Sequence, residues 1–478
     1  MPPTPASAPH RVATRSRVAR ILVAVVASLV PTLVFAAATP AEPPSIGPVP
    51  IDFILFGLVL AGVAIFHHHT LRVALIGLAV IGVYKILFSP FPSGAGMAGF
   101  ATHLVHEWVL IANLLLLLMG FALLSRHFED SRVPAWLPRL LPDDWKGAFV
   151  LLCIIFVLSS FLDNIAAALI GGTIATVVFR GKVHVGYLAA IVAASNAGGS
   201  GSVVGDTTTT MMWIDGVSPL QVVEAYVAAL VAMVIFGIPA SFQQHRYSPI
   251  TADPGDHVAI DWARVGIVAF ILVSAIVANV VVNLRYPAIA DSLPFLGLTV
   301  WLAILVATPL RAPAWSELTS ASRGAVFLCS LVLCASMMPV HKLPAASWQT
   351  AMGLGFVSAV FDNIPLTALA LRQDGYDWGF LAYAVGFGGS MIWFGSSAGV
   401  ALCSKFPEGR SVFAWLKAGW HVALAYVISY LVMLFVLGWH AEPKHKDRVA
   451  EASAVPSASS YARVQPPPST DRRAWALS

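Results

Sequence analysis

Charged residues are scarce in this 478-residue sequence, since Asp, Glu, Lys and Arg make up 11% of it and hydrophobic residues 58%. A soluble domain has about 25% charged residues, so this composition excludes an ordinary soluble protein. Cysteine is also rare, with four residues and no CxxC pair, which argues against a disulfide framework or a zinc site. The Lys and Arg residues gather between apolar runs, where they set membrane orientation, so the small positive net charge indicates no nucleic-acid partner.

Long apolar runs dominate the chain instead, and about 20 such residues suffice to cross a bilayer as a helix. We expect membrane spans near residues 51–67, 70–89, 103–125, 219–240, 263–285, 293–310, 322–340 and 415–439. A basic segment followed by an apolar run near the start of the chain is typical of a signal peptide. The polar residues near the end, rich in Pro and Ser, predict a disordered tail.

Four further apolar stretches are each interrupted by polar or glycine-rich residues. The interruptions stand at Ser159–Asn164, Asn196–Ser202, Phe361–Pro365 and Gly386–Ser390. Backbone that leaves a helix at membrane depth is tolerated only where protein or a wet cavity satisfies its hydrogen bonds. The four interruptions therefore mark a cavity.

The interruptions form two matched pairs. The sequence Asp-Asn-Ile occurs at Asp163 and again at Asp362, and each occurrence is followed by a Gly-Gly-Ser break. The number of expected spans between the two hairpins is odd, so the second hairpin enters from the opposite face. Such paired discontinuous segments are typical of secondary transporters. We therefore predict an all-α polytopic membrane protein with two inverted-topology repeats, each with a re-entrant helical hairpin and a broken transmembrane helix.

The expected division of the chain follows from these repeats. It comprises a signal-like segment and linker (1–50), a first repeat (51–240) with hairpin 147–179, a cytoplasmic linker (241–262), a second repeat (263–440) with hairpin 345–372, and a disordered tail (441–478). This topology puts most basic residues, among them Arg126, Arg264 and Arg311, on the cytoplasmic side. We expect a multi-pass protein of a bacterial-type inner membrane.

Carboxylates stand within two of the interruptions, as Asp163 and Asp362, and just after a third, as Asp206, while Glu107 lies inside another span. An ionised Asp at the bilayer centre costs about 2.5–3.5 kcal/mol, so each needs a partner or a function. One interpretation is that Asp163 and Asp362 cap the helices that follow them. The other is that a carboxylate in a partly desolvated cavity holds a proton and a cation in turn, which couples the two fluxes. Asp206, before a run of threonines, is the strongest candidate, and Glu107 fits either a proton relay or a structural role.

These blocks resemble the NhaD-type sodium/proton antiporters of the ion transporter superfamily, which also holds citrate, dicarboxylate and arsenite carriers. The resemblance covers roughly residues 50–440 and is densest at the four interruptions, above all in Gly205–Ile214. It implies exchange of Na⁺ or Li⁺ for H⁺, no cofactor, and a bilayer, small cations and protons as partners. The sequence leaves open whether the protein forms a homodimer. It also implies that Na⁺ and protons bind along a path formed by Asp163, Asn164, Asn196, Asp206, Thr208, Thr209, Asp362, Asn363, Ser390 and Ser396.

The main alternative is a Na⁺- or H⁺-coupled symporter for a di- or tricarboxylate such as citrate, on the same fold. By resemblance, such carriers have neutral hairpin tips, whereas an Asp at each tip would repel a carboxylate substrate. A receptor or membrane enzyme would need a soluble domain or a nucleophile with its base, and neither occurs. His103-x-x-His106-Glu107 does not have the H-E-x-x-H spacing of a zinc enzyme.

Overall fold

The structure is a computed structural model, and it describes residues 42–66, 69–250, 259–286, 289 and 292–441. The expected signal-like segment up to residue 41, the tail from residue 442 and part of the expected linker lie outside these residues. The described chain is almost entirely helical, and its helices confirm an all-α polytopic membrane protein. Its one small sheet is an antiparallel pair, β1 (Ser45–Ile46) and β2 (Val49–Pro50), directly before the first described helix.

The first half of the chain runs as far as the long helix that precedes residue 250. Its helices are α2 (Ile51–Ile65), α3 (Thr70–Phe88), α4 (Gly96–Asp130), α5 (Val133–Trp136), η1 (Leu137–Leu140), α6 (Trp145–Ser159), α7 (Asn164–Val178), α8 (Val185–Ser200), α9 (Thr207–Ile214), α10 (Pro219–Val223) and α11 (Ala225–Tyr247). The last of these continues past residue 240, where the expected linker begins.

The second half begins with a long helix that follows the residues left undescribed. Its helices are α12 (Trp262–Arg285), α14 (Phe295–Ala307), η2 (Trp315–Glu317), α15 (Leu318–Ser336), η3 (Val340–Lys342), α16 (Trp348–Ser358), α17 (Asn363–Gln373), α18 (Trp378–Gly388), η4 (Gly389–Met391), α19 (Ser397–Lys405), η5 (Pro407–Arg410), α20 (Val412–Ala418) and α21 (Trp420–Leu437).

Among the described residues, six helical segments are long and apolar enough to cross a membrane. They lie at Thr70–Phe88, Gly96–Asp130, Pro219–Tyr247, Trp262–Val282, Trp315–Ser336 and Trp420–Leu437, each at an expected span. Helix α4 is longer than the span predicted at 103–125. Its 35 residues reach about 50 Å, beyond the roughly 30 Å of a hydrocarbon core. The apolar run ends at Ser125, before a group of charged residues. The helix continues for one more turn, because Arg126 forms ion pairs along it with Glu129 and Asp130.

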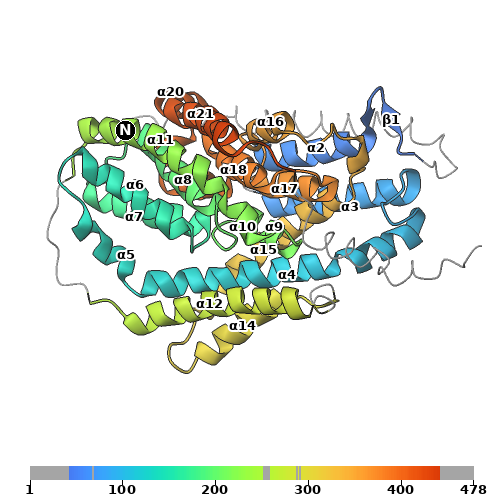
Figure 1. Ribbon diagram of the computed structural model, residues 1–478, viewed down its shortest axis with the longest axis horizontal. Helices are drawn as coiled ribbons and strands as arrows, with labels where there is room; N and C mark the ends of the chain where they lie inside the picture. The colour runs from blue at the N-terminus through green and yellow to red at the C-terminus, as the bar shows by residue number, and fades with distance from the viewer. Residues whose placement is uncertain (1–41, 67–68, 251–258, 287–288, 290–291, 442–478) are drawn as a thin grey trace, which may run out of the picture.

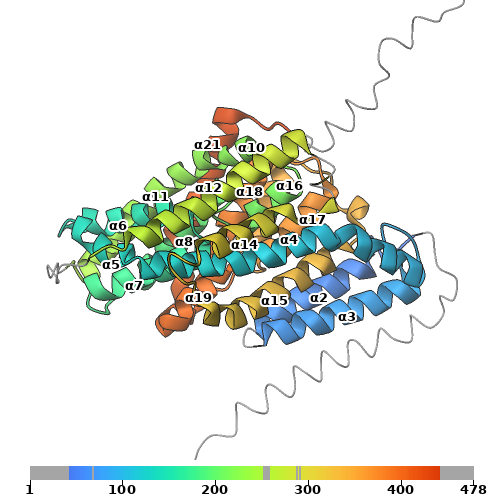
Figure 2. The same cartoon turned by 90° about the horizontal axis from the view of Figure 1, so that it is seen from below.

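Helix α4 lies between two groups of helices. Figure 1 shows α12 and α14 on one side of α4 and the interrupted helices, α6 to α9 and α16 to α18, on the other. Figure 2 shows α2, α3 and α15 side by side, next to α4. The interrupted helices from both halves of the chain are thus packed into one group.

Glycines allow the interrupted helices to approach one another closely in both halves. A Cβ atom on Gly198 of α8 would lie 2.0 Å from the backbone oxygen of Phe156 in α6. A Cβ atom on Gly388 of α18 would lie 2.3 Å from the backbone oxygen of Gly355 in α16. Since no side chain fits at either position, the glycines of the two Gly-Gly-Ser breaks bring each broken helix onto its hairpin.

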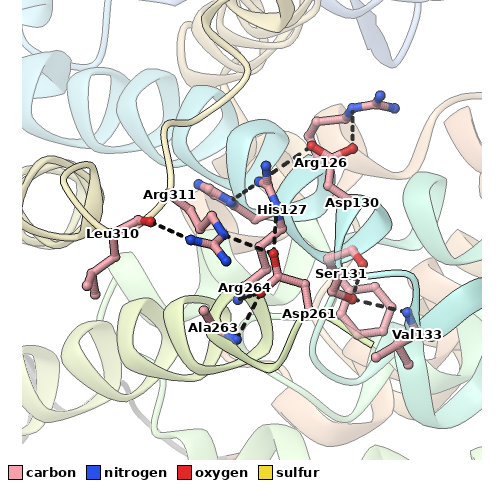
Figure 3. Close-up of polar contacts among 11 residues, drawn as sticks. Arg126, His127, Asp130, Ser131, Val133, Asp261, Ala263, Arg264, Leu310 and Arg311 are labelled. Atoms are coloured by element: carbon pink, nitrogen blue, oxygen red, sulfur yellow. Dashed lines mark hydrogen bonds and ion pairs between the residues drawn. The ribbon is translucent and has the colours of Figure 1, made fainter. Parts of the chain in front are cut away.

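A cluster of charges, which we call the α4 charge cluster, joins the end of α4 to α12 and to the loop after α14 (Figure 3). Arg126 pairs with Asp130 at 3.3 Å, and Asp130 also pairs with Arg264 at 3.5 Å. Asp261, which caps α12, accepts a hydrogen bond of 2.9 Å from Nε of Arg311. The three arginines therefore lie at the same end of the helix bundle.

Candidate ion-binding site

The two hairpin tips have the same local structure. Asp163 caps α7 with φ −53° and ψ 140°, and Asp362 caps α17 with φ −53° and ψ 139°. The carboxylate of Asp163 accepts a hydrogen bond from the backbone N–H of Ile165 at 3.2 Å, and that of Asp362 from Ile364 at 3.1 Å. The capping interpretation is therefore confirmed at both tips, and each Asp satisfies an N–H group that the helix start leaves without an intrahelical partner.

The two Gly-Gly-Ser breaks also end in matching caps. Asp206 caps α9 with φ −140° and ψ 143°, and Ser396 caps α19 with φ −136° and ψ 152°. Asp206 accepts from the N–H of Thr208, and Ser396 from the N–H of Gly399, both at 3.3 Å. The backbone of the two halves thus agrees at this position, but only the first half places a negative charge there.

A chain of buried amides and hydroxyls connects the interruptions. Asn164 at the first tip donates to the side-chain oxygen of Asn196 at 3.1 Å. The Nδ2 of Asn196 donates to the hydroxyl oxygens of Ser390 at 2.9 Å and Ser396 at 3.1 Å. All four side chains are buried, so the first tip, the first break and the second break are held together by polar contacts inside the protein.

A cavity of about 360 Å³ lies beside these caps. At its inner end the polar lining consists of Asp163, Asn164, Asp206, Thr207, Thr210, Asn363 and Ser397. Two of their atoms, Oδ2 of Asp206 and Nδ2 of Asn363, are buried without a hydrogen-bond partner among the described residues. A buried polar atom without a partner costs about 1–3 kcal/mol, so each such atom calls for an explanation, and a bound ion or water is one.

The inner end of the cavity carries oxygen donors and a net negative charge. Carboxylate, hydroxyl and amide oxygens are the ligands that hard cations such as Na⁺ prefer. The lining also lacks groups of three or more His, Cys, Asp or Glu residues arranged to hold a metal ion, as far as the described residues extend. Its carboxylate, hydroxyl and amide oxygens suit a cation or a proton, and no Lys or Arg is among the described residues that line it.

The chain is similar to several proteins that are named sodium/proton antiporters. It is 28% identical to "Sodium/proton antiporter 1" of Arabidopsis thaliana over 59% of this chain and 54% of that protein. It is 26% identical to the "Na(+)/H(+) antiporter NhaD" of Vibrio parahaemolyticus, over 57% of this chain and 76% of that protein. The NhaD of Alkalimonas amylolytica is also 26% identical, over 69% of this chain and 78% of that protein. The resemblance to NhaD-type antiporters is confirmed.

These matches cover only part of each relative's length. The chain spans about half the length of the first of these relatives and about three quarters of the two NhaD proteins. No protein-family model matches the chain. The likeness to NhaD-type antiporters thus agrees with the four interruptions and with a multi-pass membrane protein, while the activity of the whole molecule is taken up below as a proposal.

The residues that the sequence assigns to the ion path occupy three kinds of position. Those that line the cavity are Asp163, Asn164, Asp206 and Asn363. Asp362 does not line it, but accepts a hydrogen bond of 2.9 Å from Ser397, which does. Asn196, Ser390 and Ser396 form the polar chain behind the lining. Thr208 and Thr209 are buried away from the cavity, and the Thr209 hydroxyl donates to backbone oxygens of Ser202 and Asp206.

Two threonines that the predicted path omits do line the cavity, namely Thr207 and Thr210. They are three residues apart, so they share a face of α9. Helical spacing from the cap at Asp206 is the signal that would have selected them. Ser397 is similar, since it follows the cap Ser396 and faces both the cavity and Asp362.

Glu107 does not line the cavity. It is buried in α4 and forms an ion pair with Arg372 at the end of α17. This pair connects α4 to the second hairpin at the end of the molecule away from the α4 charge cluster. Of the two roles that the sequence leaves open for Glu107, the contact favours the structural one.

Proposed function

We propose that this protein is a secondary active transporter that exchanges Na⁺ or Li⁺ for H⁺ across the inner membrane by alternating access. The carboxylates of Asp163, Asp206 and Asp362 compete for the proton and the cation, and this competition couples the two movements. The two halves of the chain act as inverted repeats that expose the site to each side in turn. No cofactor takes part, and Na⁺ and H⁺ are the transported substrates.

The observation that carries the proposal is the environment of Asp206. One oxygen of its carboxylate caps α9, and the other, Oδ2, lies buried in the cavity with no hydrogen-bond partner among the described residues. A Cβ atom on Gly386 would lie 3.4 Å from Oδ2, so the second half of the chain closes over this oxygen with a residue that has no side chain. Asp163 lines the same cavity and adds a second carboxylate.

The similarity to proteins named sodium/proton antiporters supports the same substrates. The two tips support a repeat, because both have the sequence Asp-Asn-Ile, nearly equal torsion angles and a hydrogen bond from the N–H group two residues on. The caps after the two breaks have similar torsion angles as well. Figure 1 supports the inverted arrangement, since the first hairpin, α6 and α7, lies toward the end where α4 finishes, whereas α16 and α17 lie farther toward the end where α4 begins.

The test is the variant Asp206→Asn in everted membrane vesicles, with a fluorescent dye that reports the pH gradient. Asn caps a helix as well as Asp does, so the substitution keeps the structural role of the side chain and removes its charge. We expect loss of the sodium-dependent change in the pH gradient with normal amounts of protein in the membrane. Exchange at the wild-type rate would show that Asp206 is only a cap and would remove the basis of the proposal.

Asp377→Asn is the matched control. Asp377 is also a buried carboxylate that caps a helix, α18, and it accepts from the backbone N–H groups of Phe380 and His440, but it does not line the cavity. Its loss of charge should leave exchange close to the wild-type rate. Adding sodium, lithium, potassium, citrate and succinate in turn then identifies the substrate. A response to the carboxylates alone would favour the symporter instead.

A further inference from the structure

The cavity extends from the caps to the end of α4 that carries the α4 charge cluster. At this outer end the lining contains two carboxylates, Glu129 on α4 and Glu317 on η2, together with the hydroxyls of Ser125 and Ser320. Ser320 is exposed and Glu129 is partly exposed, whereas Asp206 is 2% exposed. The glutamates therefore stand at the mouth of the cavity and Asp206 at its floor.

The wall between the mouth and the floor is apolar. It includes Leu118 and Phe121 of α4, Leu328 of α15 and Leu169 of α7. A charge at the end of a channel with low-dielectric walls acts over a longer distance than the same charge on an open surface, because the walls focus its field. Carboxylates at the mouth can thus raise the concentration of cations along the whole cavity.

One positive side chain opposes the two glutamates. Arg126 donates to Glu129 at 2.9 Å and pairs with Asp130, and the charge of Glu317 also acts on it. Asp130 is shared with Arg264 of the α4 charge cluster, so Arg126 is held at the rim. The two glutamates that line the mouth therefore have one arginine beside them, and this arginine divides its contacts between Glu129 and Asp130.

The floor of the same cavity supplies the independent sign that a ligand enters. Oδ2 of Asp206 and Nδ2 of Asn363 line it, both on side chains more than nine-tenths buried, and neither has a partner among the described residues. A mouth that attracts cations and a floor with an unpartnered carboxylate oxygen belong to one route. We propose that Glu129 and Glu317 form a cation-recruiting mouth that sets the apparent affinity for Na⁺, and that Arg126 weakens it by neutralising Glu129. This inference rests on the proposed function.

The experiment measures sodium-dependent exchange by the full chain in everted vesicles, as a function of sodium concentration and of ionic strength. For the double variant Glu129→Gln/Glu317→Gln we expect the apparent KM for Na⁺ to rise about tenfold at low ionic strength, with an unchanged maximal rate. A factor of about ten is at the low end of electrostatic steering effects. Raising the ionic strength with an impermeant salt should shrink this difference, because salt screens exposed charges. Arg126→Gln should lower the KM, and Arg126→Lys should restore it.

Glu408→Gln is the control, because Glu408 is an exposed carboxylate in η5 that does not line the cavity. Its KM should equal that of the wild type. An unchanged KM in the double variant would overturn the inference, and so would a KM increase that persists at high ionic strength, since that would indicate a structural change. If the wild type itself shows no sodium-dependent exchange, the proposed function fails. If the wild type exchanges sodium and the double variant has the same KM for Na⁺, the inference about the mouth is refuted and the proposed function is not.

Discussion

The close packing of the second hairpin can be tested at two glycines of α16. A Cβ atom on Gly355 would lie 2.0 Å from Oη of Tyr426 and 2.6 Å from the backbone oxygen of Ala384. A Cβ atom on Gly353, two residues earlier in the same helix, would have no atom within 4 Å, and this residue is exposed. The variants Gly355→Ala and Gly353→Ala therefore add the same methyl group to a filled site and to an open one.

The cost at Gly355 follows from what holds Tyr426 in place. Its hydroxyl donates to the backbone oxygen of Met352 at 2.7 Å, and its ring stacks on that of Tyr383 at 6.0 Å. The ring must shift by more than about 1 Å, since non-bonded carbon atoms prefer about 3.5–4.0 Å. Overpacking costs about 1–3 kcal/mol and a lost hydrogen bond about 1 kcal/mol, so we expect Gly355→Ala to destabilise the protein by about 2–4 kcal/mol. Gly353→Ala should stabilise it by up to about 1 kcal/mol, because Ala favours a helix more than Gly does.

Thermal unfolding of the detergent-solubilised protein, followed with a thiol-reactive dye, measures both effects. The assay fits this chain because Cys329, Cys334 and Cys403 are buried in the folded state and free to react once exposed. Adding Tyr426→Phe to Gly355→Ala should recover only part of the loss, because it removes Oη and leaves the ring. Equal unfolding temperatures for Gly355→Ala and Gly353→Ala would refute the close packing of α16 that we describe.

Two further predictions concern ion pairs outside the cavity. Glu107→Gln should destabilise the protein by about 3 kcal/mol. This is the low end for breaking a buried ion pair, because Arg372 is 29% exposed. Adding Arg372→Gln to this variant should restore part of the lost unfolding temperature, because it removes the unpaired charge. The hydrogen bond from Arg311 lowers the pKa of Asp261 below its usual value. The stabilisation by Asp261 is therefore complete above about pH 5, starts to fall near the unfolded pKa of about 4 and is lost as pH falls through the lowered pKa. The unfolding temperatures of Asp261→Asn and wild type should therefore differ by a constant amount above about pH 5 and converge only in stronger acid.

Much of the helical architecture could be predicted from the sequence because its signals are local. Apolar length predicts the spans, and the polar interruptions predict the ends of α6, α8, α16 and α18. The Asp-Asn pairs predict caps, which the torsion angles of Asp163 and Asp362 confirm. The extra turn of α4 could not be predicted from hydropathy, because ion pairs along the helix stabilise it there.

The site was predictable in part, since its residues come from segments far apart in the chain. Asp163, Asp206 and Asn363 were selected because each stands at an interruption. Glu129 and Glu317 stand at ordinary helix ends, where a charge normally faces water, and only the packing of α4 against η2 brings them to one cavity. No sequence pattern distinguishes such glutamates from others at the membrane surface.

The caps at Asp206 and Ser396 differ in charge while their backbones agree. The framework around them accepts either a carboxylate or a hydroxyl, so the number of negative charges in the centre of the protein is independent of its main-chain geometry. One substitution at Ser396 would alter the electrical balance of the centre while leaving the helix ends as they are. Under the proposed function, such a substitution would change the charge offered to a cation without changing the helix ends that surround it.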